Sequence, residues 1–203
     1  MMVIGLTGSI AMGKSTAAAM LRRLGLAVFD ADASVHSLMG PKGAALPSLA
    51  QLFPGAVGPR GLDRQAVGAQ VFASPEKKAA LEALLHPMVR RLQKGFLDGQ
   101  RRQRAPFVVL DIPLLFETGG HRRCDHVLVV SAPAFLQRRR ALARPGMTSQ
   151  KFDDILSNQM PDYKKRRYAD TVIPTGLGKA VTYRALKKAL FTLQRAKKKD
   201  PNG

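Results

Sequence analysis

The sequence predicts an α/β fold in which short buried strands alternate with helices. The first observation is a glycine-rich stretch, residues 8–16, that stands between an apolar run and a helical pattern. The second is a series of short apolar runs, two of which end at an aspartate, as buried parallel strands do at a ligand-facing edge. The third is the stretch 40–105, where strand signals disappear and helical ones accumulate, which indicates a helical insertion.

The glycine-rich stretch fits the pattern G-x-x-x-x-G-K-[ST] at every fixed position. In such a loop the glycines let backbone N–H groups turn inward, and the start of the next helix adds partial positive charge. A phosphate cradle is therefore predicted, with a plain glycine-rich turn as the alternative. The residues expected at the phosphates are Gly8, Ala11, Met12, Gly13, Lys14, Ser15 and Thr16. Lys14 is expected to reach the terminal phosphates, and the Ser15 hydroxyl to ligate Mg²⁺ that arrives with the nucleotide.

The chain has 203 residues, enough for one ample core with one or two small insertions. Its first apolar residues are interrupted by Gly5 and Thr7 and lack a basic leader, so no signal peptide is expected. No apolar run approaches the length of a membrane span. The single cysteine, Cys124, cannot form an internal disulfide, which agrees with a reducing cytosol. We therefore expect a cytoplasmic protein.

The charge is strongly basic, with 33 Lys and Arg against 14 Asp and Glu and a formal net charge of +19. Such a balance favours polyanionic partners, either nucleic acid or small phosphorylated substrates. The basic residues form separate clusters, and nine Phe, three Tyr and no Trp offer few stacking platforms. A solvated basic face explains most of them better, and specific nucleic-acid binding is not expected.

A short apolar run, residues 27–29, predicts a buried strand that delivers Asp30 and Asp32 at its C-terminal end. Asp32 and His36 stand four residues apart, so on a helix they share a face and could converge on one ligand. The alternative is that Asp30 caps the helix and His36 merely packs. Since capping needs only one carboxylate, Asp32 is the better candidate for a functional role.

Within the helical stretch 40–105, Ser74 and Pro75 are expected to be the N-cap and the first residue of a helix. His86 and Pro87 are expected to interrupt the helical pattern, which resumes after them. A lone histidine before proline is usually structural, and the residue spacing alone assigns no other role to His86.

A continuous apolar run, residues 107–110, predicts another buried strand, with Asp111 at its tip. Asp111 could meet Mg²⁺ through water, or it could hold the next loop. The apolar residues of that loop include Leu115 and Phe116. They could be core or part of a substrate wall.

A further strand, residues 126–130, leads to a helix carrying Gln137, Arg140 and Arg144. The two arginines are i and i+4, so they can project together toward phosphates as a bidentate clamp. Thr148 is expected to cap the next helix, and an Arg-flanked loop before a short helix is typical of a closing lid.

The last strand is expected at residues 171–173, followed by a C-terminal helix with an apolar stripe. Residues 197–203 are expected to form a frayed tail.

Taken together, these motifs resemble the dephospho-coenzyme A kinase family over nearly the whole chain. The matching pieces are Gly-Leu-Thr-Gly-Ser-Ile before Gly13-Lys14-Ser15, Asp30-Ala31-Asp32 with His36, Leu85-His86-Pro87, Pro113-Leu114-Leu115-Phe116-Glu117, Gln137 with Arg140 and Arg144, Gln159, and Ala169-Asp170. The phosphate loop alone fits many nucleoside triphosphatases. The combination of Asp-Ala-Asp, His-Pro and Pro-Leu-Leu-Phe-Glu is much more selective.

The resemblance implies phosphorylation of the ribose 3′-hydroxyl of dephospho-coenzyme A by ATP with Mg²⁺, the last step of coenzyme A synthesis. It implies a P-loop NTPase-like, three-layer α/β core with a five-stranded parallel sheet, a helical substrate-binding insertion and a small lid. We place the core at residues 1–39, 106–137 and 168–203, the insertion at 40–105 and the lid at 138–167. Small-molecule substrates, no membrane, and a monomer or weak oligomer are expected.

The resemblance also assigns roles. Asp32 is expected near the 3′-hydroxyl, either taking its proton or orienting it, and lid arginines are expected to stabilise developing charge. The catalytic residues are then Asp32, Lys14 and Arg140, and Arg144 joins the nucleotide-binding set. The substrate-binding residues are Asp32, His36, His86, Leu115 and Phe116.

The sequence departs from the family in two local places. It has Ala11 and Met12 where the family loop often has Gly or Ser, and Met12 is large for a cradle; because backbone donors hold the phosphates, we expect binding to survive. Pro174 and Thr175 follow the last strand where the family usually shows a polar Asp or Asn. Since proline has no N–H, adenine contacts are not assigned there. The alternatives are another P-loop kinase and a basic nucleic-acid-binding ATPase.

Overall fold

The computed structural model describes residues 1–199, and the chain folds as two compact units. The first unit contains residues 1–29 and those from 104 onward, and the second contains residues 30–103. The second unit thus begins at Asp30, earlier than residue 40 where we placed the insertion. The segment 138–167 lies within the first unit.

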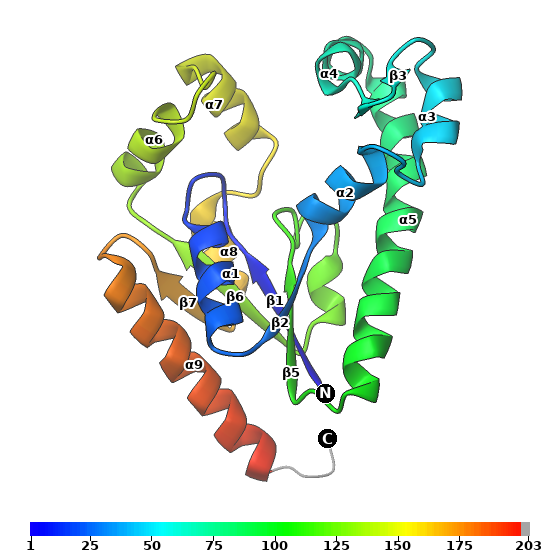
Figure 1. The fold of residues 1–203 in the computed structure, drawn as a ribbon. Coiled ribbons are helices and arrows are strands. Elements are labelled where there is room, and N and C mark those ends of the chain that lie inside the picture. The colour runs from blue at the N-terminus through cyan, green and yellow to red at the C-terminus, as the bar shows by residue number, and fades with distance from the viewer. Residues whose placement is uncertain (200–203) are drawn as a thin grey trace. The chain divides into compact units, whose positions relative to one another are not determined.

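Five strands form one sheet in the order β2-β5-β1-β6-β7 (Figure 1). They are β1 (Met2–Thr7), β2 (Ala27–Asp30), β5 (Phe107–Asp111), β6 (His126–Ser131) and β7 (Thr171–Pro174). Strand β1 pairs in parallel with β5 and β6, and β6 pairs in parallel with β7. The predicted five-stranded parallel sheet is confirmed, with β1 in its centre.

Helices cover the sheet because alternate residues of each strand face opposite sides. In β6, Leu128 and Val130 belong to a core that includes side chains of α1 and α9, whereas Val127 and Val129 belong to a second core with the loop after β5. The helices of this unit are α1 (Lys14–Arg23), η1 (Gly120–Arg123), α6 (Ala134–Leu142), α7 (Ser149–Ser157), α8 (Asp162–Tyr168) and α9 (Lys179–Lys199). The three-layer α/β prediction is confirmed.

The C-terminal helix α9 carries the predicted apolar stripe, since Leu186, Leu190 and Leu193 are buried against the first core. Helix α9 continues to Lys199, so the first residues of the predicted tail are helical. The rest of that tail, residues 200–203, lies outside the described residues.

The second unit is mainly helical, as predicted. Its elements are α2 (Ala31–Met39), α3 (Leu46–Leu52), β3 (Val57–Gly58), β4 (Gly61–Leu62), α4 (Arg64–Ala73) and α5 (Pro75–Arg102). Strands β3 and β4 pair as an antiparallel hairpin, which the sequence did not indicate. Two-residue strands are too short to show an alternating apolar pattern.

Helix α5 corrects the expected interruption at His86 and Pro87. It runs without a break through Pro87, although the proline removes one backbone donor. Buried or half-buried Leu81, Leu84 and Leu85 before the proline, and Met88 and Val89 after it, all pack into one core of this unit. Continuous packing on both sides offsets the lost hydrogen bond and keeps the chain helical.

Predicted helix caps are present in both units. The Ser74 hydroxyl accepts from Lys77 N at 3.2 Å at the start of α5, and the Thr148 hydroxyl accepts from Lys151 N at 3.2 Å at the start of α7. None of the helices within residues 1–199 has the length and apolar character that a membrane crossing requires.

Candidate phosphate and acceptor sites

The glycine-rich loop connects the central strand β1 to α1 at the carboxyl edge of the sheet, where open α/β folds bind ligands. Gly13 is the N-cap of α1 and has φ of 90°, a left-handed conformation that favours glycine. At Gly8 a Cβ atom would lie 2.4 Å from Val130 Cγ2 and 2.8 Å from the Val130 carbonyl oxygen. Both glycines of the motif are therefore required by the backbone, and the helix start presents N–H groups to a ligand.

Met12 does not fill the cradle. Its side chain is 2% exposed and lies in the core between the sheet and α1, and its Sδ accepts from Ala132 N at 3.2 Å. Ala11 has φ of 60°, so it takes the left-handed conformation without being glycine. The two departures from the family loop are accommodated by burial and by local strain.

Lys14, the first residue of α1, forms an ion pair with Asp111, the last residue of β5. Lys14 Nζ donates to Asp111 Oδ1 at 2.5 Å, and their side chains are 15% and 2% exposed. The pair holds the lysine head group at the ligand-binding edge of the sheet. Asp111, for which the sequence suggests a role at Mg²⁺ or in the next loop, thus binds Lys14 in this structure.

The residues at this edge fit a magnesium ion that arrives with a nucleotide. Ser15 and Thr16 are exposed at the start of α1, and the Asp111 carboxylate ends β5. No group of three or more His, Cys, Asp or Glu side chains gathers as a metal centre within residues 1–199. A hydroxyl and a carboxylate, completed by phosphate oxygens and water, suit Mg²⁺ better than an all-protein cage would.

Thr175, after β7, is a site residue that sequence reasoning missed. Its hydroxyl donates to the carbonyl oxygen of Met12 at 2.6 Å, and its side chain contacts the position where Gly13 would carry a Cβ. The contact joins residues 163 positions apart in the chain, so no local pattern could reveal it. The loop after the last strand thus stabilises the phosphate loop through its hydrogen bond to Met12.

Arg140 and Arg144 do not form the expected helical clamp. Helix α6 ends at Leu142, so Arg144 lies beyond its last turn and the i, i+4 geometry does not apply. Arg140 is half-buried and its Nη2 donates to the Thr175 carbonyl oxygen at 2.8 Å. Arg144 is exposed. Arg140 thus contacts Thr175, the residue that binds the phosphate loop at Met12. The role of Arg144 stays a prediction.

In the second unit, the two aspartates at the start of α2 make different contacts. The Asp30 carboxylate accepts from Ala33 N at 2.9 Å and is the N-cap of α2. Asp32 lies exposed in the first turn, and within the described residues of its unit its carboxylate has no hydrogen-bond or ion-pair partner. The capping role is filled by Asp30, which leaves the Asp32 carboxylate for other contacts.

The two predicted substrate histidines also belong to the second unit, and both are exposed. His36 lies one turn after Asp32 on α2, and Arg64 Nη1 lies 3.1 Å from its Nε2. Arg64 also lines a cavity of about 630 Å³ at the β3–β4 hairpin. His86 lies in the middle of α5.

Leu115 and Phe116 lie in the core of the first unit, not on a surface. They are 0% and 7% exposed and pack against Val127 and Val129. The structure therefore favours the core alternative for both side chains over the substrate wall. Burial of the Cys124 thiol, which borders the same core, raises its pKa to about 11, so little thiolate is expected at neutral pH.

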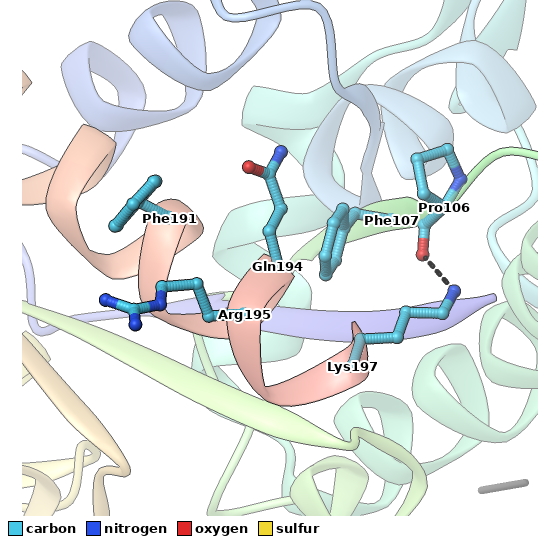
Figure 2. A pocket seen from close by; sticks show the side chains of 6 residues that line it. All are labelled: Pro106, Phe107, Phe191, Gln194, Arg195 and Lys197. Carbon is cyan, nitrogen blue, oxygen red and sulfur yellow. Dashed lines mark hydrogen bonds between the residues drawn. The ribbon is translucent and has the colours of Figure 1, made fainter. Parts of the chain in front are cut away.

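A second cavity, of about 550 Å³, lies at the end of the sheet where β5 begins, opposite the end that carries the phosphate loop. Figure 2 shows the side chains that line it. Pro106 and Phe107 line it at the start of β5, whereas Asp111 ends that strand. Lys197 Nζ donates to the Pro106 carbonyl oxygen at 3.3 Å and lies 5.7 Å from the centre of the Phe107 ring. The remaining lining residues are Phe191, Gln194 and Arg195. This cavity takes no part in the phosphate site.

A phosphate loop on the central strand of a five-stranded parallel sheet, with its lysine at the first turn of the following helix, defines a P-loop nucleotide-binding protein. Comparison with known proteins is more specific. The dephospho-CoA kinase family matches residues 2–177, and the chain belongs to that family. The resemblance seen in the sequence motifs is confirmed.

Relatives and solved structures agree with this assignment. Dephospho-CoA kinase of Rhodospirillum rubrum is 56% identical over 197 residues, which cover 96% of this chain and 92% of the relative. The enzyme of Paramagnetospirillum magneticum is 58% identical over 166 residues, which cover 82% of this chain and 78% of the relative. The crystal structure of TT1252 from Thermus thermophilus is 39% identical, with a TM-score of 0.82 and coverage of 94% and 96%.

Proposed function

We propose that this chain transfers the terminal phosphate of ATP to the ribose 3′-hydroxyl of dephospho-coenzyme A, which gives coenzyme A and ADP. The observation that carries the proposal is the phosphate loop on β1 in a chain that belongs to the dephospho-CoA kinase family. Phosphoryl transfer depends mainly on positioning and on charge stabilisation, so the residues that hold the two substrates decide the reaction.

The phosphate loop is the ATP half of the site. Gly8 and Gly13 allow the backbone of residues 8–16 to turn its N–H groups toward the phosphates, and the start of α1 adds positive potential. Lys14 carries the fixed cation for the β- and γ-phosphate oxygens. Its contact with Asp111 keeps the ammonium group at the edge of the sheet before ATP arrives.

Mg²⁺ would be held by the Ser15 hydroxyl and, through water, by Asp111. When bound, it neutralises charge on the phosphate oxygens. The support for this assignment is the donor set, one exposed hydroxyl and one carboxylate at the same edge of the sheet as Lys14.

Asp32, in the second unit, is the candidate for the carboxylate that contacts the acceptor hydroxyl. A carboxylate that accepts the hydrogen bond of the 3′-hydroxyl can orient it and take its proton as the phosphate transfers. Asp32 is suited to this because it is exposed and because Asp30 already caps α2. His36 shares the exposed face of α2, and His86 lies on α5, the long helix of the same unit. We assign both to contacts with dephospho-coenzyme A.

Residues 138–167 would act as a lid over ATP. Arg140 uses one N–H group on the Thr175 carbonyl oxygen, and a guanidinium has further donors for phosphate oxygens. Arg144 is exposed beside the glycine-containing turn after α6 and would add a second cation on closure. We also propose that the protein works in the cytoplasm, where ATP is available and a single cysteine stays reduced.

The test is ADP release measured with ATP, Mg²⁺ and one of three acceptors: dephospho-coenzyme A, AMP or adenosine. We expect turnover with dephospho-coenzyme A and little with the other two. Phosphorylation of AMP with dephospho-coenzyme A inert would overturn the assignment and favour another P-loop kinase.

A further inference from the structure

Ile10, in the phosphate loop, has both of its backbone polar groups bound by glutamine side chains. Gln137 Nε2 donates to the Ile10 carbonyl oxygen at 2.9 Å, and Ile10 N donates to Gln159 Oε1 at 2.9 Å. Gln137 belongs to α6, and Gln159 follows α7. The two side chains bind the N–H and the carbonyl oxygen of Ile10, as a paired strand would, although none of the strands within residues 1–199 pairs with Ile10.

The loop needs such support because its next residue is strained. Ala11 has φ of 60°, which an L residue adopts rarely, and it must do so for the backbone to curve toward α1. Met12, on the other side of Ala11, is held by the core through Thr175 and Ala132. Ile10 is held by the two glutamines. The strained residue is thus fixed between one anchor in the core and one anchor in the segment of α6 and α7.

A small apolar cluster accompanies the two hydrogen bonds. Ala11 packs with Ala141 of α6 and Phe152 of α7, and Ile10 packs at the edge of the same cluster. Helices α6 and α7 also pack on each other (Figure 1). A shift of these helices would therefore move the anchors of Ile10 and release the loop.

We propose that Gln137 and Gln159 are positioning residues that hold the phosphate loop in its phosphate-binding conformation and couple it to the α6–α7 segment. The inference deepens the ATP half of the proposed function and rests on it. The two glutamines act through backbone atoms, since their bonds go to the Ile10 peptide. Nucleotide affinity should respond to them, and acceptor affinity should not.

The variants are Gln159→Met and Gln137→Met, which keep the length of the side chain and remove its amide. Gln194→Met, on the exposed side of α9, is the matched control. Gln137 is 6% exposed, so its variant risks misfolding; Gln159 is less buried and keeps the proposal testable. Each variant is checked by thermal unfolding, and the ADP dissociation constant is then measured well below the midpoint.

We expect each variant to bind ADP about tenfold more weakly, the effect of one lost hydrogen bond, and the control to bind within about twofold. The KM for ATP should rise in step, with the KM for dephospho-coenzyme A unchanged. Hydrogen exchange gives a residue-specific readout: the Ile10 amide should exchange faster in Gln159→Met than in Gln137→Met, because only Gln159 accepts from that N–H.

Unchanged ADP affinity in a folded Gln159→Met variant would overturn the proposal. An equal rise in both KM values together with a lower unfolding midpoint would also overturn it, because it would indicate a general structural role. ADP binding does not depend on the acceptor. If the wild-type protein fails to phosphorylate dephospho-coenzyme A while ADP affinity still responds to Gln159, the proposed function fails and the positioning role stands.

Discussion

Replacing Asp111 by Asn tests the Lys14–Asp111 pair, on which the geometry of the ATP half depends. The substitution keeps the shape and an oxygen acceptor and removes only the negative charge. Breaking a fully buried ion pair costs about 3–5 kcal/mol. Since Lys14 is 15% exposed and its hydrogen bond can persist, we expect the variant to lose about 2 kcal/mol of stability.

For a chain of this length, a loss of about 2 kcal/mol lowers the unfolding midpoint by about 4–8 °C. Although the variant should be less stable, it should bind ADP more tightly than the wild type when Mg²⁺ is absent. The Asp111 carboxylate repels phosphate oxygens that approach Lys14, so its removal should tighten Mg²⁺-free ADP binding by about tenfold.

The assay is calorimetric unfolding and ADP titration in the presence of a chelator, with wild type and Asp98→Asn as controls. Within residues 1–199, Asp98 forms its ion pairs with Lys94 and Arg101 on the surface of α5, so loss of its charge should change stability very little. An Asp111→Asn variant with unchanged stability and unchanged ADP affinity would refute the reasoning.

Three further predictions follow from single residues. Gly8→Ala should lower the free energy of unfolding in urea by about 1–3 kcal/mol, because the new Cβ would lie 2.4 Å from Val130 Cγ2. Gly95→Ala, in open space on α5, should raise it by about 0.5–1 kcal/mol. Equal effects of the two substitutions would contradict the close packing at Gly8. Because the pKa of Cys124 is raised from 9.0 to about 11, its contribution to stability should be present below pH 9 and lost as the pH rises toward 11. For the same reason iodoacetamide should modify the thiol of the folded protein slowly at pH 8. Rapid alkylation of the folded protein would argue against burial of the thiol. Asp32→Asn should lower kcat with ATP affinity largely kept, as steady-state kinetics would measure, and an unchanged kcat would remove Asp32 from the reaction.

Much of the fold could be predicted because its signals are local. The loop from Gly8 to Ser15 is specified by residue types at fixed spacing, and the caps at Ser74 and Thr148 are specified by single side chains next to helical patterns. The five strands of the sheet were each recognisable as short apolar runs. A helix needs only one capping carboxylate, and Asp30 is the residue that caps α2. The role of Asp32 stays a prediction.

The features that escaped prediction leave no local pattern in the sequence. Continuity of α5 through Pro87 is decided by packing within its unit, and the β3–β4 hairpin is too short to leave a pattern. The supports of the phosphate loop, from Thr175 to Met12 and from two glutamines to Ile10, join residues more than a hundred positions apart. Gln137 and Gln159 were visible as motif residues, but their partners were not.

The proposed reaction transfers the phosphate of ATP, held by the phosphate loop, to the 3′-hydroxyl of dephospho-coenzyme A. Phosphorus NMR of the products, with wild type beside Lys14→Ala, tests it most directly. We predict one new ribose 3′-phosphomonoester signal that grows in step with ADP in the wild type and is absent in the folded variant. A phosphate at another hydroxyl, or wild-type turnover by Lys14→Ala, would contradict the account.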